Sequence, residues 1–157
     1  MTSPPLPPVA ELLPHSGTMI FIDRVLAYDR DKIVAETTVR NEPLFPDRPR
    51  IPVYVGLEYM AQTIGAFAGL RQLAVGEGAK IGMLLGTRDF RAEVPAFDIG
   101  ERLTLSATLV FESDDLGVFD CAIHRGSNRL VSARLNVFQP ESFDGFLSAQ
   151  TGRDIAT

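Results

Sequence analysis

Apolar residues dominate the chain from Val53 to about Leu73, and this stretch predicts one long helix. No proline interrupts it, and Gly76 and Gly78 supply the stop behind it. A helix of roughly 20 residues would be about 30 Å long. Glu58 is its single carboxylate, and few other polar residues break the apolar surface. Because nearly every side of such a helix needs cover, we expect it at the centre of the fold.

The segments around this helix alternate apolar and polar residues, which is typical of strands that bury one face. The predicted strands cover residues 18–29, 32–40, 80–94, 101–112, 116–126 and 128–140. One predicted face of residues 101–112 is apolar and consists of Leu103, Leu105, Ala107, Leu109 and Phe111. Residues 41–52 hold four prolines and predict a loop, while Val9 to Leu13 could form one helical turn.

A hairpin, one long helix and four further strands place the chain in the α+β class. The economical packing is one curved antiparallel sheet wrapped around the helix. Since one sheet cannot cover every side of the helix, we expect a second copy of the chain to help, which predicts a symmetric dimer. We expect residues 1–157 to form a single domain, with an extended proline-rich lead-in over residues 1–8 and a frayed tail over about 148–157.

Charge and composition argue against several classes of protein. A net charge of −5 on 157 residues does not suit a general nucleic-acid binder, which must neutralise phosphates. Glu58 near the centre of the predicted helix, with strands on both sides, argues against a membrane span. Cys121 is the only cysteine, so no internal disulfide is possible and a reducing cytoplasm fits best. The first residues do not have the pattern of a signal peptide.

Glu58 and Gln62 are the candidates for chemistry on the predicted helix. They are four residues apart, so their side chains share one helix face. One interpretation is a polar stripe that faces solvent or another subunit. Apolar neighbours such as Leu57 and Ile64 favour burial instead, and burial raises the pKa of a carboxyl group. A carboxylic acid with a raised pKa can donate a proton near neutral pH.

The histidines and the cysteine are less informative by themselves. His15 follows a proline and reads as a histidine at the surface or at a helix end. His124 alternates with the polar set of residues 116–126 and is expected on a polar sheet face. Cys121 belongs to the apolar set and is expected to be an inert core thiol. Two histidines without clustered carboxylates make no metal site, and we expect neither a metal nor another cofactor.

Two motifs in the first half of the chain resemble those of one known family. Residues 12–26, "LLPHSGTMIFIDRVL", resemble the "LLPHRxPFLLVDRV" opening of the β-hydroxyacyl-acyl-carrier-protein dehydratases. Farther on, "NEPLF" and "IPVYVGLEYMAQTIG" resemble the family's "NEPFF" and "MPGVLxxEAMAQxxG". The resemblance implies the hotdog fold, an antiparallel sheet around a long central helix. It also implies a dimer with an acyl tunnel at its interface and a substrate carried by an acyl carrier protein.

The resemblance assigns roles to single residues. A histidine in the family's "GHFP" loop is the base at the α-carbon, the carboxylate matching Glu58 handles the departing β-hydroxyl, and the glutamine matching Gln62 supports that carboxylate. Here Asp47 or Arg48 stands where the histidine should be, so the chain resembles a divergent branch that lacks it. An arginine cannot serve as the base. The substrate-binding residues implied by the resemblance are Gln62, Val53, Tyr54, Leu57 and Arg48.

Three functions remain open from the sequence. The first is a 3-hydroxyacyl thioester dehydratase in which another group, with His15 as the candidate, replaces the missing histidine. The second is a catalytically silent subunit that binds acyl chains or an acyl carrier and pairs with an active relative. The third is acyl-thioester hydrolysis, which needs only one helix carboxylate and a backbone donor. The "LPH" and "NEP" motifs favour the dehydratase branch.

Overall fold

The computed structural model of the protein describes residues 6–15, 17–41, 47–76 and 82–139. Its helical elements are α1 (Val9–Leu12), the 3₁₀ turns η1 (Gly17–Met19) and η2 (Val53–Val55), and the long helix α2 (Gly56–Ala74). Its strands are β1 (Arg24–Tyr28), β2 (Lys32–Thr38), β3 (Arg50–Pro52), β4 (Met83–Ala92), β5 (Ala96–Asp98), β6 (Arg102–Ser113), β7 (Leu116–Arg125) and β8 (Asn128–Phe138). The predicted long helix and the helical turn before Pro14 are both confirmed.

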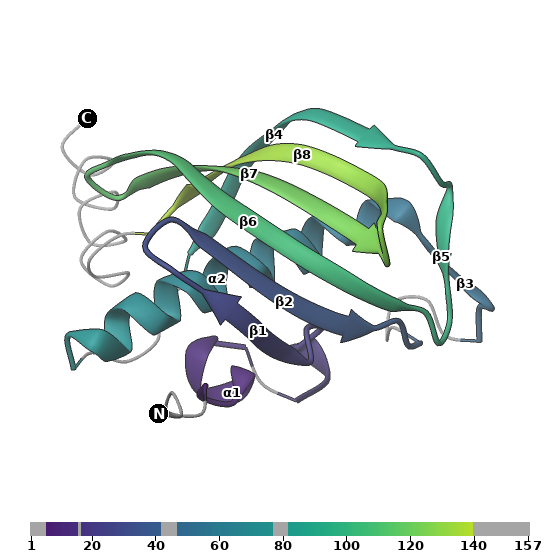
Figure 1. Ribbon diagram of the computed structural model, residues 1–157, viewed down its shortest axis with the longest axis horizontal. Coiled ribbons are helices and arrows are strands. Elements are labelled where there is room, and N and C mark those ends of the chain that lie inside the picture. Colours follow the sequence, from purple (N-terminus) through teal and green to yellow (C-terminus); the bar gives the residue numbers. More distant parts are fainter. Residues whose placement is uncertain (1–5, 16, 42–46, 77–81, 140–157) are drawn as a thin grey trace, which may run out of the picture.

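The described strands form one antiparallel sheet of six strands in the order β1-β2-β6-β7-β8-β4, and a separate pair, β3-β5. Figure 1 shows α2 running behind the large sheet, which curves over it. The prediction of an α+β hotdog fold, with a curved antiparallel sheet around one long helix, is confirmed. In the described part of the chain no helix is long and apolar enough to cross a membrane.

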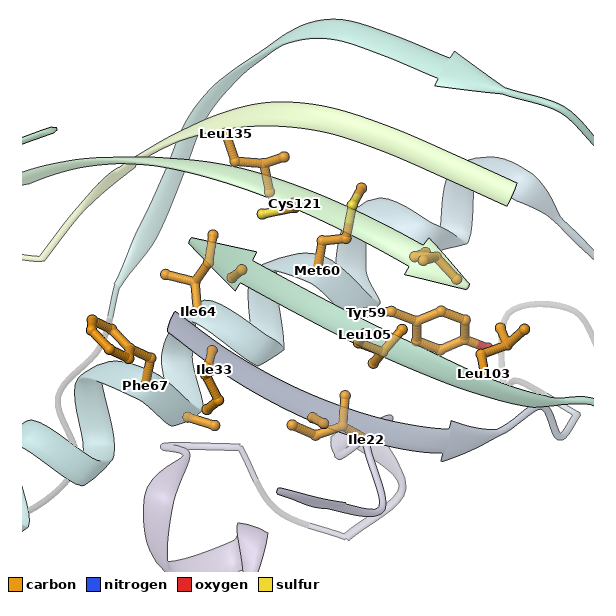
Figure 2. Close-up of a cluster of buried hydrophobic side chains, with 14 of the residues drawn as sticks. Ile22, Ile33, Tyr59, Met60, Ile64, Phe67, Leu103, Leu105, Cys121 and Leu135 are labelled. Atoms are coloured by element: carbon orange, nitrogen blue, oxygen red, sulfur yellow. The ribbon is translucent and has the colours of Figure 1, made fainter. Parts of the chain in front are cut away.

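The core lies between α2 and the inner face of the sheet. Met60 on α2 points toward Cys121 and Leu135 of the sheet, and Leu105 of β6 lies beside Tyr59 of α2, as Figure 2 shows. All five side chains are buried. Alternation along β6, β7 and β8 brings one apolar residue in two to this face, which is why the pattern of the sequence located the strands.

The predicted apolar face of residues 101–112 is only partly correct. Leu103, Leu105 and Ala107 are fully buried, but Phe111 is 55% exposed. The register between β6 and β7 shifts between Leu109 and Phe111, so that Phe111 pairs with Val118 of the outer face. A bulge inserts one residue into the alternation and turns the following side chains to the opposite face. The sequence pattern alone does not reveal this bulge.

Two further expectations about strands are wrong. The strand predicted from residue 18 begins only at Arg24, where β1 starts, and the 3₁₀ turn η1 precedes it. Residues 50–52, expected in a loop, and residues 96–98, which lie between two predicted strands, form the β3-β5 pair. Ile51 and Phe97 at its centre are fully buried, so core packing stabilises a pair too short for strand propensity to indicate.

Several expectations concern residues outside the described part. The first five residues of the proline-rich lead-in, residues 42–46 of the "NEPLF" motif region, Gly78 and the tail over 148–157 all lie there.

Candidate functional site

A cavity of about 530 Å³ runs along α2, with walls from the helix, the segment at His15 and the ends of β4, β6, β7 and β8. On α2 its lining residues recur every three or four positions, as one face of a helix requires. The middle of this face consists of Glu58, Ala61, Gly65, Ala68 and Gln72, with Gln62, Ile64, Phe67 and Arg71 beside it and Val75 directly after the helix. Three of these residues are alanine or glycine, and their small size leaves room beside the helix.

Glu58 and His15 line the same part of this cavity. His15 Nε2 lies 3.8 Å from Glu58 Oε1, and the two side chains are 33% and 44% exposed. The expected burial of Glu58 is therefore wrong for a single chain, because its carboxylate borders an open cavity rather than packed core. His15 Nδ1 is buried and has no hydrogen-bond partner among the described residues. The arrangement places a carboxyl group and an imidazole where one small substrate could contact both.

Gln62 connects Glu58 to the segment before β1. Its side-chain amide donates hydrogen bonds to the Met19 carbonyl at 2.7 Å and to Glu58 Oε1 at 3.1 Å. Its carbonyl oxygen accepts one from the Phe21 backbone N–H at 2.8 Å. Only 1% of Gln62 is exposed, so these bonds supply the partners that a buried amide needs. They also supply partners for the Met19 carbonyl and the Phe21 N–H, two backbone groups that precede β1.

Two glycines of α2 allow the segment before His15 to approach the helix closely. A Cβ at Gly69 would lie 2.2 Å from the Leu12 carbonyl oxygen, and a Cβ at Gly65 would lie 2.9 Å from Leu13 Cδ2. Only glycine permits the first contact. The chain therefore rests on α2 at residues 12 and 13, two residues before His15. Sequence analysis did not identify this contact, although two glycines four apart in a helix can indicate a close approach.

The opposite part of the cavity contains an ion pair. Arg71 Nη1 on α2 lies 3.1 Å from both carboxylate oxygens of Glu112 on β6. The Arg71 guanidinium carbon also lies 5.5 Å from the centre of the Phe67 ring. Phe67 packs edge-to-face on Phe119 of β7, with 5.8 Å between ring centres. All four residues line the cavity, and the sequence offered no pattern that pairs Arg71 with Glu112.

The remaining predicted substrate-binding residues lie elsewhere. Val53 and Tyr54 form η2, Leu57 lies in the first turn of α2, and Arg48 precedes β3. None of the four lines the cavity described above, whereas Gln62 does. Their proposed contacts with substrate stay predictions.

Cys121 and His124 lie where the sequence pattern placed them. Cys121 is 4% exposed in the core, and burial, with a smaller contribution from Asp120, raises the pKa of its thiol to about 12. Such a thiol is not a nucleophile near neutral pH. His124 is half-buried and pairs with Thr104 on the outer face of the sheet, away from α2. The described residues hold no group of three or more histidine, cysteine or acidic side chains that could bind a metal.

Known proteins are similar to this chain in sequence or in fold. The 3-hydroxyacyl-(acyl-carrier-protein) dehydratase FabZ of Chlamydia abortus is 39% identical over 105 residues, which cover 61% of this chain and 66% of that protein. The chain thus spans about two thirds of that relative's length. A protein of Pyrococcus horikoshii, PH1136, shares the fold with a TM-score of 0.61 at 9% identity, over 87% of this chain and 97% of its own.

A more similar solved structure is the dehydratase heterocomplex ApeI:P from Xenorhabdus doucetiae. One of its chains is 29% identical to this one, with a TM-score of 0.84, and the match covers 92% of this chain and 99% of that one. The sequence model of the ApeP-like family, described as ApeP dehydratase, matches residues 7–148. The long helix with Glu58 and Gln62, the opening segment with His15 and the surrounding sheet all fall within this match, and the chain belongs to the ApeP-like dehydratase family.

Proposed function

We propose that this protein removes water from a 3-hydroxyacyl thioester carried by an acyl carrier protein and gives a 2-enoyl thioester. The observation that carries the proposal is the pair formed by His15 and Glu58, 3.8 Å apart on the wall of one cavity. Membership of a dehydratase family and similarity to FabZ support it. A cavity of about 530 Å³ has the size of a small-molecule site.

The two side chains supply the two proton transfers that the elimination requires. Nε2 of neutral His15 takes the proton from C2 of the substrate, and the electron pair of that C–H bond forms the C2–C3 double bond. The bond between C3 and the hydroxyl oxygen breaks, and its electron pair leaves with the oxygen. Glu58 in its acid form gives its proton to the departing hydroxyl, which leaves as water. The Gln62 amide donates to Glu58 Oε1 and keeps the carboxyl group on the cavity wall.

For Glu58 to act as an acid, water has to leave its surroundings when substrate binds. In the single chain 44% of its side chain is exposed. An acyl chain in the cavity and a second subunit over the helix would both remove water from it. The proposal therefore includes a dimer, either of two identical chains or with a related subunit. It also includes a cytoplasmic location, where an acyl carrier substrate would be available and Cys121 would stay reduced.

A mass-spectrometric assay tests the proposal. The purified protein is incubated with a 3-hydroxyacyl carrier thioester, and the carrier-bound product is examined for loss of one water. We expect Glu58→Gln and His15→Ala each to lower the rate by about 100-fold or more, the usual contribution of one proton transfer. His124→Ala, which changes the other histidine, should leave the rate unchanged. Full activity of His15→Ala would refute the assignment of the base.

A catalytically silent subunit is the second candidate, and one observation favours it. A histidine that acts as a base is usually oriented through its other ring nitrogen, yet Nδ1 of His15 has no partner among the described residues. The similar structure from Xenorhabdus doucetiae is a dehydratase heterocomplex. In this case the chain would bind acyl carrier or acyl chain and support an active partner.

Mixing separates the two candidates. The chain is combined with a purified dehydratase of the same organism, and assembly and rate are compared with each protein alone. A stable heterodimer in which Glu58→Gln and His15→Ala change nothing would establish the silent role. If the isolated chain turns over the substrate as fast as the mixture does, the silent role is excluded. Release of free acid in place of water loss would instead indicate thioester hydrolysis.

A further inference from the structure

The ion pair between Arg71 and Glu112 joins the two walls of the cavity. Arg71 belongs to α2 and Glu112 to β6, and both line the cavity that also holds Glu58. Cavity-lining residues continue past the pair, with Val75 directly after the end of α2 and Asp114 beyond Glu112. The pair therefore divides the cavity into a part on the Glu58 side and a part beyond it.

The lining differs on the two sides of this bridge. Between Glu58 and the bridge, the walls carry apolar side chains, including Ile64, Phe67, Leu109 and Phe119. Beyond the bridge they carry the polar residues Gln72, Asp114, Asp115 and Gln139 next to the apolar residues Met83, Leu116 and Val75. An apolar chain that enters at Glu58 can exclude water from the first part, and it meets charge at the bridge.

The distance from the reactive end to the bridge can be worked from the helix. Glu58 and Arg71 are thirteen residues apart on α2, which is about 20 Å at a rise of about 1.5 Å per residue. An extended chain advances about 1.2 Å per bond, as the roughly 3.3–3.6 Å span of a three-bond residue shows. The part of the cavity before the bridge therefore accommodates on the order of 15 bonds.

The bridge is held in position but is easy to displace. The guanidinium stacks on Phe67, which in turn packs on Phe119, so Arg71 has a defined place across the cavity. The Arg71 and Glu112 side chains are 50% and 42% exposed. Exposed ion pairs contribute little to folding stability, so the two side chains can be replaced without unfolding the protein.

We propose that Arg71 and Glu112 form a gate that sets the longest acyl chain the site accepts. This inference rests on the proposed acyl substrate, but not on which reaction the site performs. Chains that end before the bridge bind with it intact. Longer chains must separate the ion pair or bend out of the cavity, and they gain nothing from their additional methylenes.

Binding of unreactive probes tests the gate apart from catalysis. The probes are the octyl and octadecyl thioethers of coenzyme A, which neither dehydration nor hydrolysis can consume, and calorimetry gives their affinities. Arg71→Ala and Glu112→Ala remove the bridge in two ways, since the second leaves Arg71 on Phe67. The double variant Arg71→Glu with Glu112→Arg restores an ion pair with reversed sign. Arg50→Ala breaks a comparable exposed pair with Asp98, neither residue of which lines the cavity, and serves as the matched control.

We expect both alanine variants to bind the octadecyl probe at least about tenfold more tightly than the wild type, since a few newly buried methylenes suffice for this. Their affinity for the octyl probe should not change, and the reversed pair should restore discrimination. Unchanged octadecyl affinity in both alanine variants would overturn the gate, even if the protein dehydrates its substrate. Tighter octadecyl binding by both alanine variants of a protein that dehydrates no substrate would support the gate and refute the dehydratase proposal.

Discussion

Substituting Gly69 with alanine tests the contact that brings the opening segment onto α2. The new Cβ would lie 2.2 Å from the Leu12 carbonyl oxygen, whereas ordinary contacts begin at 3.4 Å. The backbone at Leu12 must therefore move by about 1.2 Å, the difference between the two distances. Leu12 is 1% exposed and Leu13 is 3% exposed, so this movement disturbs two buried side chains.

Two terms of opposite sign determine the magnitude. Alanine in a helix interior is favoured over glycine by about 1 kcal/mol. Overpacking against a backbone atom costs about 1–3 kcal/mol, and partial loss of two buried leucines adds about 1–3 kcal/mol. The terms add up to a fall of about 1–5 kcal/mol in the free energy of unfolding of Gly69→Ala, with a midpoint of about 3 kcal/mol. Gly65→Ala is the matched control, because its Cβ meets only the end of the Leu13 side chain at 2.9 Å, which can rotate away.

Urea denaturation followed by far-ultraviolet circular dichroism measures both variants at one protein concentration. The chain contains no tryptophan, so fluorescence is less useful. The expected order of stability is wild type, then Gly65→Ala, then Gly69→Ala. The Gly69→Ala variant should also shift the NMR signals of His15 relative to those of His124, the only other histidine. A Gly69→Ala protein that is as stable as the wild type, with unchanged His15 signals, would refute the close approach.

Four further predictions concern the same helix and sheet. Gln62→Leu removes three hydrogen bonds from a buried site, so the free energy of unfolding should fall by about 2 kcal/mol or more in urea titrations. Ala68→Leu should weaken binding of acyl probes by calorimetry, with little effect on the urea midpoint, because it fills cavity rather than core. Cys121 should resist iodoacetamide in the native protein and react in urea, since burial raises its pKa to about 12. Between pH 9.0 and about 12 the Cys121 thiol loses its proton in the unfolded protein and keeps it in the folded protein, so the free energy of unfolding should fall as the pH rises through this window. Urea titrations of the wild type and of Cys121→Ala across this pH range measure the effect, because the variant lacks the contribution of the thiol.

The fold was predictable from the sequence because its main elements have strong periodic patterns. An apolar run without proline indicated α2, and alternation indicated β6, β7 and β8, whose inner faces are buried. The β3-β5 pair was not predictable, since three-residue strands depend on burial of Ile51 and Phe97 by the rest of the protein. The outward turn of Phe111 depends on a bulge, which alternation cannot reveal.

The site was predictable only where residues are close in sequence or belong to a recognised motif. The spacing of Glu58 and Gln62 predicted that they share one helix face, and there the Gln62 amide donates a hydrogen bond to Glu58. The exposure of Glu58 could not be predicted, because small residues along α2 create the cavity beside it. The Arg71–Glu112 pair joins residues 41 apart in sequence, and only the packing of β6 over α2 brings them together.

The most direct test of the proposed dehydratase function is the reverse reaction in water labelled with heavy oxygen. The protein is incubated with a 2-enoyl carrier thioester, and the position of the label is determined by mass spectrometry. Our account predicts label in a new hydroxyl group at C3 of a thioester that is still intact, and labelling that is about 100-fold slower or more with Glu58→Gln. Label in a released carboxylic acid, or no labelled product at all, would contradict it.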